Sequence, residues 1–248
     1  MKQTRLLMGM PITVEVIDPL ATGALFDRVF DYFQSIDDRF STYKSRSEIS
    51  LINQRRLSAD SISPQMHTVF TMAEEVRQKT NGYFDIRHNG IIDPSGLVKG
   101  WAVYNAAEMI RQEGYRDFYV EAGGDFQVFD RNGQGQPWRV GIRSPYNLSE
   151  IVKVLSVSDC GVATSGSYIR GQHIYNPKES QPPDPHILSL TVIGPDICNV
   201  DCYATAAFAM GREGIAFIAG LDGYEGYSID QDRRATFTPG FARYVYHA

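Results

Sequence analysis

Residues 198–211, C-N-V-D-C-Y-A-T-A-A-F-A-M-G, limit the possible folds of this chain more than any other stretch. Small apolar residues recur at helical spacing through its second half, and Gly211 supplies a left-handed stop, so the stretch predicts a closely packed helix. Asp201 and Thr205 are four residues apart and share one face if the helix is already wound at Asp201. A carboxylate beside a hydroxyl suits a hard cation such as Mg²⁺. The alternative is that Asp201 is an N-cap and Thr205 a packed core residue.

Composition narrows the class of protein. A chain of 248 residues that is 43% hydrophobic can bury a sizeable core, as one domain over 1–248 or as two intimate lobes. The net charge of -5 and the lack of a Lys/Arg run argue against a nucleic-acid-binding surface. We expect no secretory signal, because the N-terminus shows no apolar h-region with a small-residue cleavage site, and no membrane span, because no run of about 18 apolar residues occurs. We therefore expect a cytoplasmic protein. Three cysteines without a C-x-x-C pair predict free thiols in a reducing compartment.

Periodicity predicts both helices and strands along the chain. The expected helices span 21–36, a short piece after Ser47, 63–80, 101–112 and 215–219, beside the helix described above. The expected strands span 12–17, two pieces of 115–129, 138–143, 151–157, 188–193, 226–229 and 241–246. Strands and helices alternate without a steady βαβ order, so the fold class is α+β.

A glycine-bearing turn precedes the expected helix at 101–112. Its sequence is D-P-S-G-L-V-K-G, residues 93–100. Free backbone N–H groups at a helix N-terminus attract anions, and Lys99 would add a positive charge there. The turn matches neither a P-loop nor a dinucleotide-binding G-x-G-x-x-G. In isolation, His173 is typical of a structural histidine.

Short motifs follow one another in the order known from one enzyme family. They are M-G (8–9), F-S-T-Y (40–43) with S-E-I-S-L-I-N (47–53), G-Y-F-D (82–85), D-P-S-G-L-V-K-G-W-A (93–102), G-G-D (123–125), W-R-V-G-I (138–142), A-T-S-G-S-Y (163–168), H-I-Y-N-P (173–177) and D-C-Y-A-T-A (201–206). Together they resemble the ApbE family of FAD:protein FMN transferases. The resemblance implies a T-fold-related α+β fold whose mixed lobes surround a central FAD cleft.

The resemblance also implies a set of site residues. Mg²⁺, or Mn²⁺, would be held by Asp201, Thr205 and the backbone carbonyl of Gly96, an all-oxygen set that leaves positions for the FAD pyrophosphate. Asp201 and His173 would be catalytic, His173 as an acid/base or phosphate-contacting group. The residues implied to contact FAD are Met8, Tyr43, Tyr83, Phe84, Asp85, Asp93, Lys99 and Tyr175.

The implied reaction moves the FMN part of FAD onto a Thr or Ser hydroxyl of an acceptor flavoprotein and releases AMP. The alternatives are hydrolysis of FAD to FMN and AMP, and a non-catalytic FAD-binding protein. We expect a cytosolic acceptor and a monomer or homodimer. The chain departs from the family pattern at Asn176 and Tyr104, where Asp is common, and the connection 85–93 is shorter than in longer members.

Overall fold

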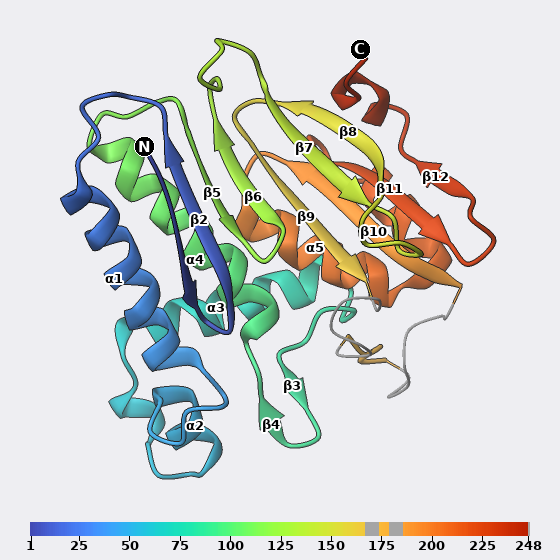
Figure 1. The fold of residues 1–248 in the computed structure, drawn as a ribbon. Helices are drawn as coiled ribbons and strands as arrows, with labels where there is room; N and C mark the ends of the chain where they lie inside the picture. Colours follow the sequence, from blue (N-terminus) through green and yellow to red (C-terminus); the bar gives the residue numbers. More distant parts are fainter. Residues whose placement is uncertain (167–173, 179–185, 248) are drawn as a thin grey trace.

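The computed structural model describes residues 1–166, 174–178 and 186–247, and an eight-stranded antiparallel sheet runs through it (Figure 1). The strand order is β1 (Lys2–Leu7), β2 (Met10–Val16), β5 (Phe118–Ala122), β6 (Asp125–Phe129), β9 (Cys160–Gly166), β10 (Ile187–Gly194), β11 (Glu225–Asp230) and β12 (Ala235–Phe237). Two small hairpins accompany it, β3 (Arg87–His88) with β4 (Ile91–Ile92) and β7 (Trp138–Arg143) with β8 (Ile151–Val157). Mixed strands and helices confirm the α+β class.

Helices cover one face of the large sheet, and the β7–β8 hairpin covers the other (Figure 1). The helices are α1 (Gly23–Phe40), α2 (Glu48–Asn53), α3 (Pro64–Lys79), α4 (Ser95–Gln112), α5 (Ile197–Ala209) and α6 (Gly214–Ala219). Three short 3₁₀ turns are η1 (Ala59–Ser61), η2 (Gly211–Glu213) and η3 (Phe241–Tyr244). The α4 and α5 helices pack directly against each other and against the sheet.

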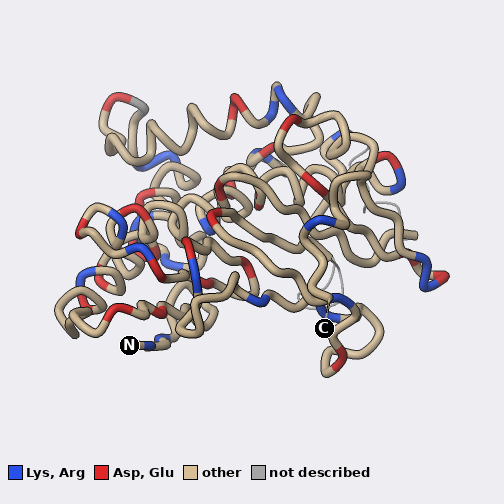
Figure 2. The backbone as a smooth tube through the Cα atoms, turned by 90° about the horizontal axis from the view of Figure 1, so that it is seen from above, with Lys and Arg blue, Asp and Glu red and all other residues tan. Residues whose placement is uncertain are grey.

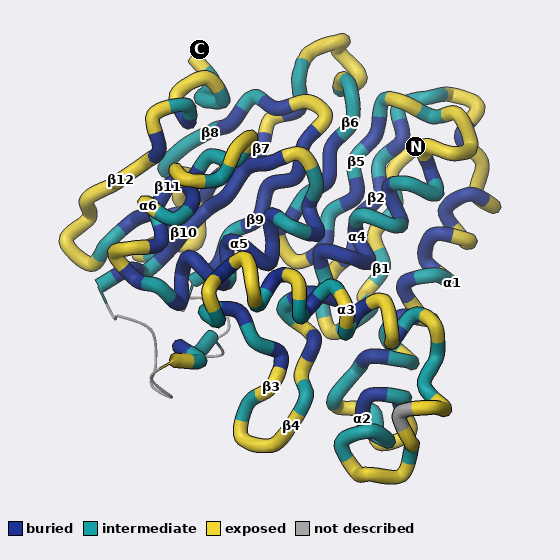
Figure 3. Tube along the Cα trace, turned by 180° about the vertical axis from the view of Figure 1, so that it is seen from behind, coloured by how far each residue is buried: buried dark blue, intermediate teal, exposed yellow. Residues whose placement is uncertain are grey.

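The sheet separates two hydrophobic cores, one on each face. The helix-side core is built around Phe26, Phe30 and Phe33 of α1, whose spacing places one buried face toward the sheet. The hairpin-side core contains Trp138 and Leu155. Burying each large apolar side chain contributes about 1.5–3 kcal/mol. Figure 3 shows the buried residues along the sheet strands and the inner sides of α4 and α5.

Several element ends agree with the sequence. The Ser47 hydroxyl accepts a hydrogen bond from the Ser50 amide at 3.1 Å and starts α2. The Ser63 hydroxyl does the same for the Met66 amide at 3.2 Å, with Pro64 in the first turn of α3. The strands predicted at 138–143 and 151–157 are confirmed as β7 and β8.

One predicted helix has the wrong start, and one predicted strand is wrong. The helix expected at 101–112 begins earlier, at Ser95, where the Asp93 carboxylate accepts the Ser95 N–H at 3.0 Å and so pairs one of the free amides at the helix start. The strand expected at 241–246 is the 3₁₀ turn η3 instead, with an isolated bridge from Val245 to Leu155.

The edge strands β1 and β12 have no counterpart in the sequence reading. The β1 strand is joined to β2 by a tight turn in which Met8 and Gly9 both have positive φ, 52° and 73°. All three residues of β12 are exposed. Edge strands of this kind carry little of the apolar alternation by which a strand is recognised.

Basic and acidic residues are interspersed along the chain in the view of Figure 2. Within the described ranges, no helix is long and apolar enough to cross a membrane. The three cysteines, Cys160, Cys198 and Cys202, are free and buried, as predicted.

Candidate active site

The start of α5 is fixed by two side chains. The Asp196 carboxylate accepts the Asn199 N–H at 2.8 Å, and the buried Gln127 side chain accepts the Ile197 N–H at 2.8 Å. The helix is therefore already wound at Asp201, which lies in its second turn. The alternative of Asp201 as an N-cap is wrong, because Asp196 fills that position.

A close crossing of α4 and α5 holds the Asp201 carboxylate. A Cβ atom added at Gly100 would lie 2.7 Å from the Ile197 carbonyl oxygen and 2.8 Å from the Asp201 Cβ, so a side chain does not fit between the helices. The Gly100 N–H donates to Asp201 Oδ2 at 3.1 Å. The glycine thus brings a backbone donor directly against a buried carboxylate.

Lys99 lies between two buried carboxylates. Its Nζ contacts Asp125 Oδ2 and is 3.3 Å from Asp201 Oδ1, while the side chains of Asp125 and Asp201 are only 2% and 4% exposed. Asp125 Oδ1 in turn accepts the Thr164 N–H of β9 at 3.0 Å. Burial raises the pKa of Asp201 to about 7, with the Asp125 charge adding to the rise and Lys99 opposing it.

Hydroxyl and carbonyl groups surround this cluster. Thr205 lies one turn after Asp201, and its Oγ1 is 3.4 Å from the Ser165 Oγ of β9. On the α4 side, the Gly96 carbonyl oxygen is 4.0 Å from the Cys202 Sγ. The part of the chain that the structure describes contains no group of three or more His, Cys, Asp and Glu side chains suited to a metal.

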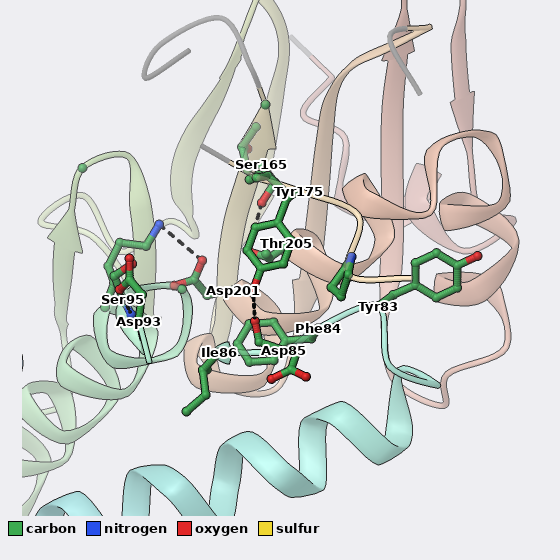
Figure 4. Close-up of a pocket in the computed structure, with 17 residues that line it drawn as sticks. Tyr83, Phe84, Asp85, Ile86, Asp93, Ser95, Ser165, Tyr175, Asp201 and Thr205 are labelled. Carbon is green, nitrogen blue, oxygen red and sulfur yellow. Dashed lines mark hydrogen bonds and ion pairs between the residues drawn. The ribbon is translucent and has the colours of Figure 1, made fainter. Parts of the chain in front are cut away.

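Asp201, Thr205, Lys99, Gly96 and Ser165 line a solvent-open cleft (Figure 4). The lining residues are Tyr83, Phe84, Asp85, Ile86, Asp93, Ser95, Gly96, Lys99, Gly123, Thr164, Ser165, Gly166, Ile174, Tyr175, Pro177, Asp201 and Thr205. They come from α4, α5, β9, the β5–β6 turn and the segments 83–86 and 174–178. One part of the cleft is therefore rich in oxygen and charge, and another is rich in aromatic rings.

Aromatic side chains are fixed on the second part of the cleft. The Tyr175 hydroxyl donates to the Asp85 carbonyl at 2.6 Å, as Figure 4 shows, and its ring stacks on His88 at 3.8 Å between centroids. The Tyr83 ring has the Lys178 ammonium 4.3 Å from its centroid. The short connection 85–93 is thus a hairpin, β3–β4, that supports Tyr175.

Most residues predicted for the site do meet in this cleft. Those that line it are Tyr83, Phe84, Asp85, Asp93, Gly96, Lys99, Tyr175, Asp201 and Thr205. Two do not: Met8 packs against the helix-side core in the β1–β2 turn, and the Tyr43 side chain is 97% exposed after α1. His173 lies outside the described residues. Asn176 is buried and accepts the Lys178 N–H at 3.0 Å.

The sequence reading missed Asp125 and Ser165. Both belong to motifs quoted above, G-G-D and A-T-S-G-S-Y, but neither motif indicates that Asp125 pairs with Lys99 or that Ser165 lines the cleft. Asp125 meets a lysine from a helix 26 positions earlier, a pairing that no local spacing encodes. A carboxylate at the start of a mostly apolar strand was the available indication, since isolated charges are rarely buried without a partner.

The fold and the cleft define a class: an α+β protein whose cleft, between its helices and its central sheet, is lined by charged, hydroxyl and aromatic side chains. The chain belongs to the ApbE family, whose sequence profile matches residues 8–92 and 87–227.

Two relatives match over most of the chain. The FAD:protein FMN transferase of Vibrio cholerae is 25% identical over 238 residues, which covers 73% of this chain and 71% of the relative. The FAD:protein FMN transferase of Salmonella typhimurium is 24% identical over 287 residues, with coverages of 87% and 82%.

Solved structures share the fold. The flavin transferase ApbE from Vibrio cholerae superposes with a TM-score of 0.86 at 21% identity, covering 98% of both chains. The ApbE protein from Thermotoga maritima gives 0.87 at 18% identity, covering 100% of this chain and 99% of the other. These likenesses confirm the ApbE-like α+β fold that the sequence predicts.

Proposed function

We propose that this protein transfers the FMN part of FAD to a Thr or Ser hydroxyl of an acceptor flavoprotein and releases AMP. The observation that carries the proposal is one cleft, in an ApbE-family chain, that joins a buried Lys–Asp cluster to an aromatic wall. The Lys99 ammonium in this cluster suits a pyrophosphate oxygen, and aromatic faces suit the flat rings of a dinucleotide. The names of the relatives, FAD:protein FMN transferase, support the same chemistry.

We further propose Mg²⁺, with Mn²⁺ as a substitute, at Asp201, Thr205 and the Gly96 carbonyl. The fit rests on the chemistry of the donors, since all three are oxygens, and on charge. When Asp201 is ionised, the two carboxylates that flank the single Lys99 ammonium leave a negative charge unbalanced in a buried place. When bound, the metal would neutralise phosphate charge and polarise the phosphorus.

The chain's own groups bind and orient the reactants. Lys99 offers ammonium protons to phosphate oxygens, and the Tyr175 ring, held from behind by His88, offers a surface to a planar ring. In the transfer, a bond forms between the acceptor oxygen and the FMN phosphorus, and the bond from that phosphorus to AMP breaks. We assign the proton of the acceptor hydroxyl to His173, because histidine is the commonest general base in enzymes and residue 173 directly precedes the cleft residue Ile174 in the sequence.

Incubation with FAD and Mg²⁺, with and without an acceptor flavoprotein, tests the proposal. AMP is measured by chromatography, and flavin bound to the acceptor is measured by fluorescence in a denaturing gel. We expect AMP and labelled acceptor only when both proteins are present. AMP without acceptor would make the protein an FAD hydrolase, and tightly bound FAD without AMP would make it a carrier.

A pair of variants controls the assay. Asp201→Ala should abolish transfer while the fold survives. Asp222→Ala, an exposed aspartate in the turn before β11, should keep full activity. Near wild-type transfer by Asp201→Ala would contradict the metal assignment.

We also place the reaction in the cytoplasm, where a reducing environment suits three free, buried thiols. Fractionation of cells that express the protein tests this placement. Recovery in a membrane or secreted fraction would contradict it.

A further inference from the structure

Asp125 is a buried carboxylate to which the proposed reaction gives no role. It opens β6 directly after the Gly123–Gly124 turn, and only 2% of its surface is exposed. Its Oδ1 accepts the Thr164 N–H at 3.0 Å, and its Oδ2 contacts the Lys99 Nζ. A charge buried this deeply is costly unless it is paired and hydrogen-bonded, and Asp125 is both.

Asp125 and Asp201 are arranged alike around Lys99. Each carboxylate gives one oxygen to a backbone N–H, of Thr164 in one case and of Gly100 in the other. Each turns its second oxygen to the ammonium. The contact with Asp125 is the closer one, and the distance from Nζ to Asp201 Oδ1 is 3.3 Å. The two carboxylates therefore share Lys99 unequally.

This unequal sharing affects any cation that binds Asp201. An ammonium that pairs fully with Asp201 Oδ1 occupies a lone pair that a divalent ion needs, and a buried ion pair is strong because water does not screen it. We infer that Asp125 is a positioning residue: it draws the Lys99 ammonium toward β6, which weakens the pairing of Lys99 with Asp201 Oδ1 and keeps that oxygen available to a divalent cation. This inference rests on the metal site of the proposed function.

The variant Asp125→Asn removes the charge and retains the shape. The amide oxygen can still accept the Thr164 N–H, but Lys99 is no longer drawn toward β6. The ammonium then moves onto Asp201, and a divalent ion has to displace it. Because close buried charge pairs couple strongly, we expect the affinity for the cation to fall about tenfold or more.

A loss of affinity alone does not distinguish positioning from the loss of a nearby negative charge, so the test is a double-mutant cycle. Mn²⁺ is titrated into the protein without FAD, and the free ion is measured by electron paramagnetic resonance. The four proteins are wild type, Asp125→Asn, Lys99→Met and the double variant. A purely long-range charge effect makes Lys99→Met raise Mn²⁺ affinity by the same factor in both backgrounds.

Positioning predicts a non-additive result. Lys99→Met should raise Mn²⁺ affinity only a few-fold in the wild-type background, because Asp125 already weakens the pairing of Lys99 with Asp201. In the Asp125→Asn background, the factor by which Lys99→Met raises Mn²⁺ affinity should be about tenfold larger than in the wild-type background. Equal factors in the two backgrounds, an unchanged affinity in Asp125→Asn, or no Mn²⁺ binding by the wild type would each overturn the inference.

Controls separate this inference from folding and from the transfer reaction. Asp222→Asn, an exposed change of the same charge, should leave Mn²⁺ affinity unchanged. If the double variant does not fold, the crystal structure of Asp125→Asn decides: Lys99 displaced onto Asp201 supports the inference, and an unmoved ammonium overturns it. If the wild type transfers FMN but the Mn²⁺ cycle is additive, this inference is wrong and the proposed function stands. If the Mn²⁺ cycle is non-additive but the wild type transfers no FMN, the proposed function is wrong and this inference stands.

Discussion

The crossing of α4 and α5 at Gly100 makes a quantitative prediction for Gly100→Ala. The added Cβ would lie 2.7 Å from the Ile197 carbonyl oxygen and 2.8 Å from the Asp201 Cβ. Nonbonded carbon contacts are comfortable only at about 3.5–4.0 Å, so the helices must separate by about 0.5–1 Å. Overpacking of this kind costs about 1–3 kcal/mol, and the better helix propensity of alanine offsets about 1 kcal/mol of it.

The net expectation is a loss of about 0–2 kcal/mol in the free energy of unfolding. For a chain of this length, that corresponds to a Tm lowered by at most about 8 °C. Separation of the helices also displaces the Asp201 carboxylate, which accepts the Gly100 N–H. A displacement near 1 Å can lower a rate about 10²-fold. The rate of FMN transfer should therefore fall strongly, although the Tm changes by only a few degrees.

Calorimetry and the transfer assay measure the two effects on the same preparation. The matched control is Gly23→Ala at the first residue of α1, where an added Cβ meets no atom within 4 Å. That variant should equal the wild type in Tm and activity. A Gly100→Ala protein with wild-type stability and transfer would refute the close-crossing account of Asp201.

Three further predictions concern single side chains. Because the pKa of Asp201 is raised to about 7, the metal-free fold loses stability as pH rises from about 4 through 7, and Mg²⁺ must displace a proton below about pH 7. The increase in Tm on adding Mg²⁺ should therefore be larger at pH 8 than at pH 5.5, and equal increases would contradict the buried carboxylate. Tyr175→Ala should raise the KM for FAD about 5- to 10-fold through lost stacking, whereas Tyr175→Phe should not; an unchanged KM in the alanine variant would exclude the ring from binding. Asp196→Ala removes the α5 cap and should cost about 1 kcal/mol in thermal unfolding, and an unaltered Tm would refute the cap.

Local chemistry made much of the fold predictable. Ser63 and Pro64 predict the start of α3 because a hydroxyl cap and a proline both suit the first helical turn. The residues of β7, W-R-V-G-I-R, alternate apolar and polar side chains and match a strand with one buried face. Asp201 and Thr205 were likewise predictable as neighbours, since four-residue spacing is a property of the helix alone.

The remaining features depend on contacts between distant segments. The α4 helix starts earlier than predicted, where the Asp93 side chain accepts the Ser95 N–H. The glycine-bearing sequence of this turn gives no indication of that hydrogen bond. The pairing of Asp125 with Lys99 depends on the β5–β6 turn lying beside α4, and the sequence gives no measure of that distance. Tyr43 failed to reach the cleft although its motif resembles the family pattern, because the loop after α1 turns its side chain to solvent.

A crystal of this protein soaked with FAD and Mn²⁺ tests the central claim most directly, because the anomalous signal of manganese locates the ion. We expect manganese within bonding distance of Asp201, Thr205 and the Gly96 carbonyl. We expect the FAD diphosphate to contact both the manganese and Lys99. Manganese elsewhere, or a diphosphate bound away from these three residues, would contradict the account.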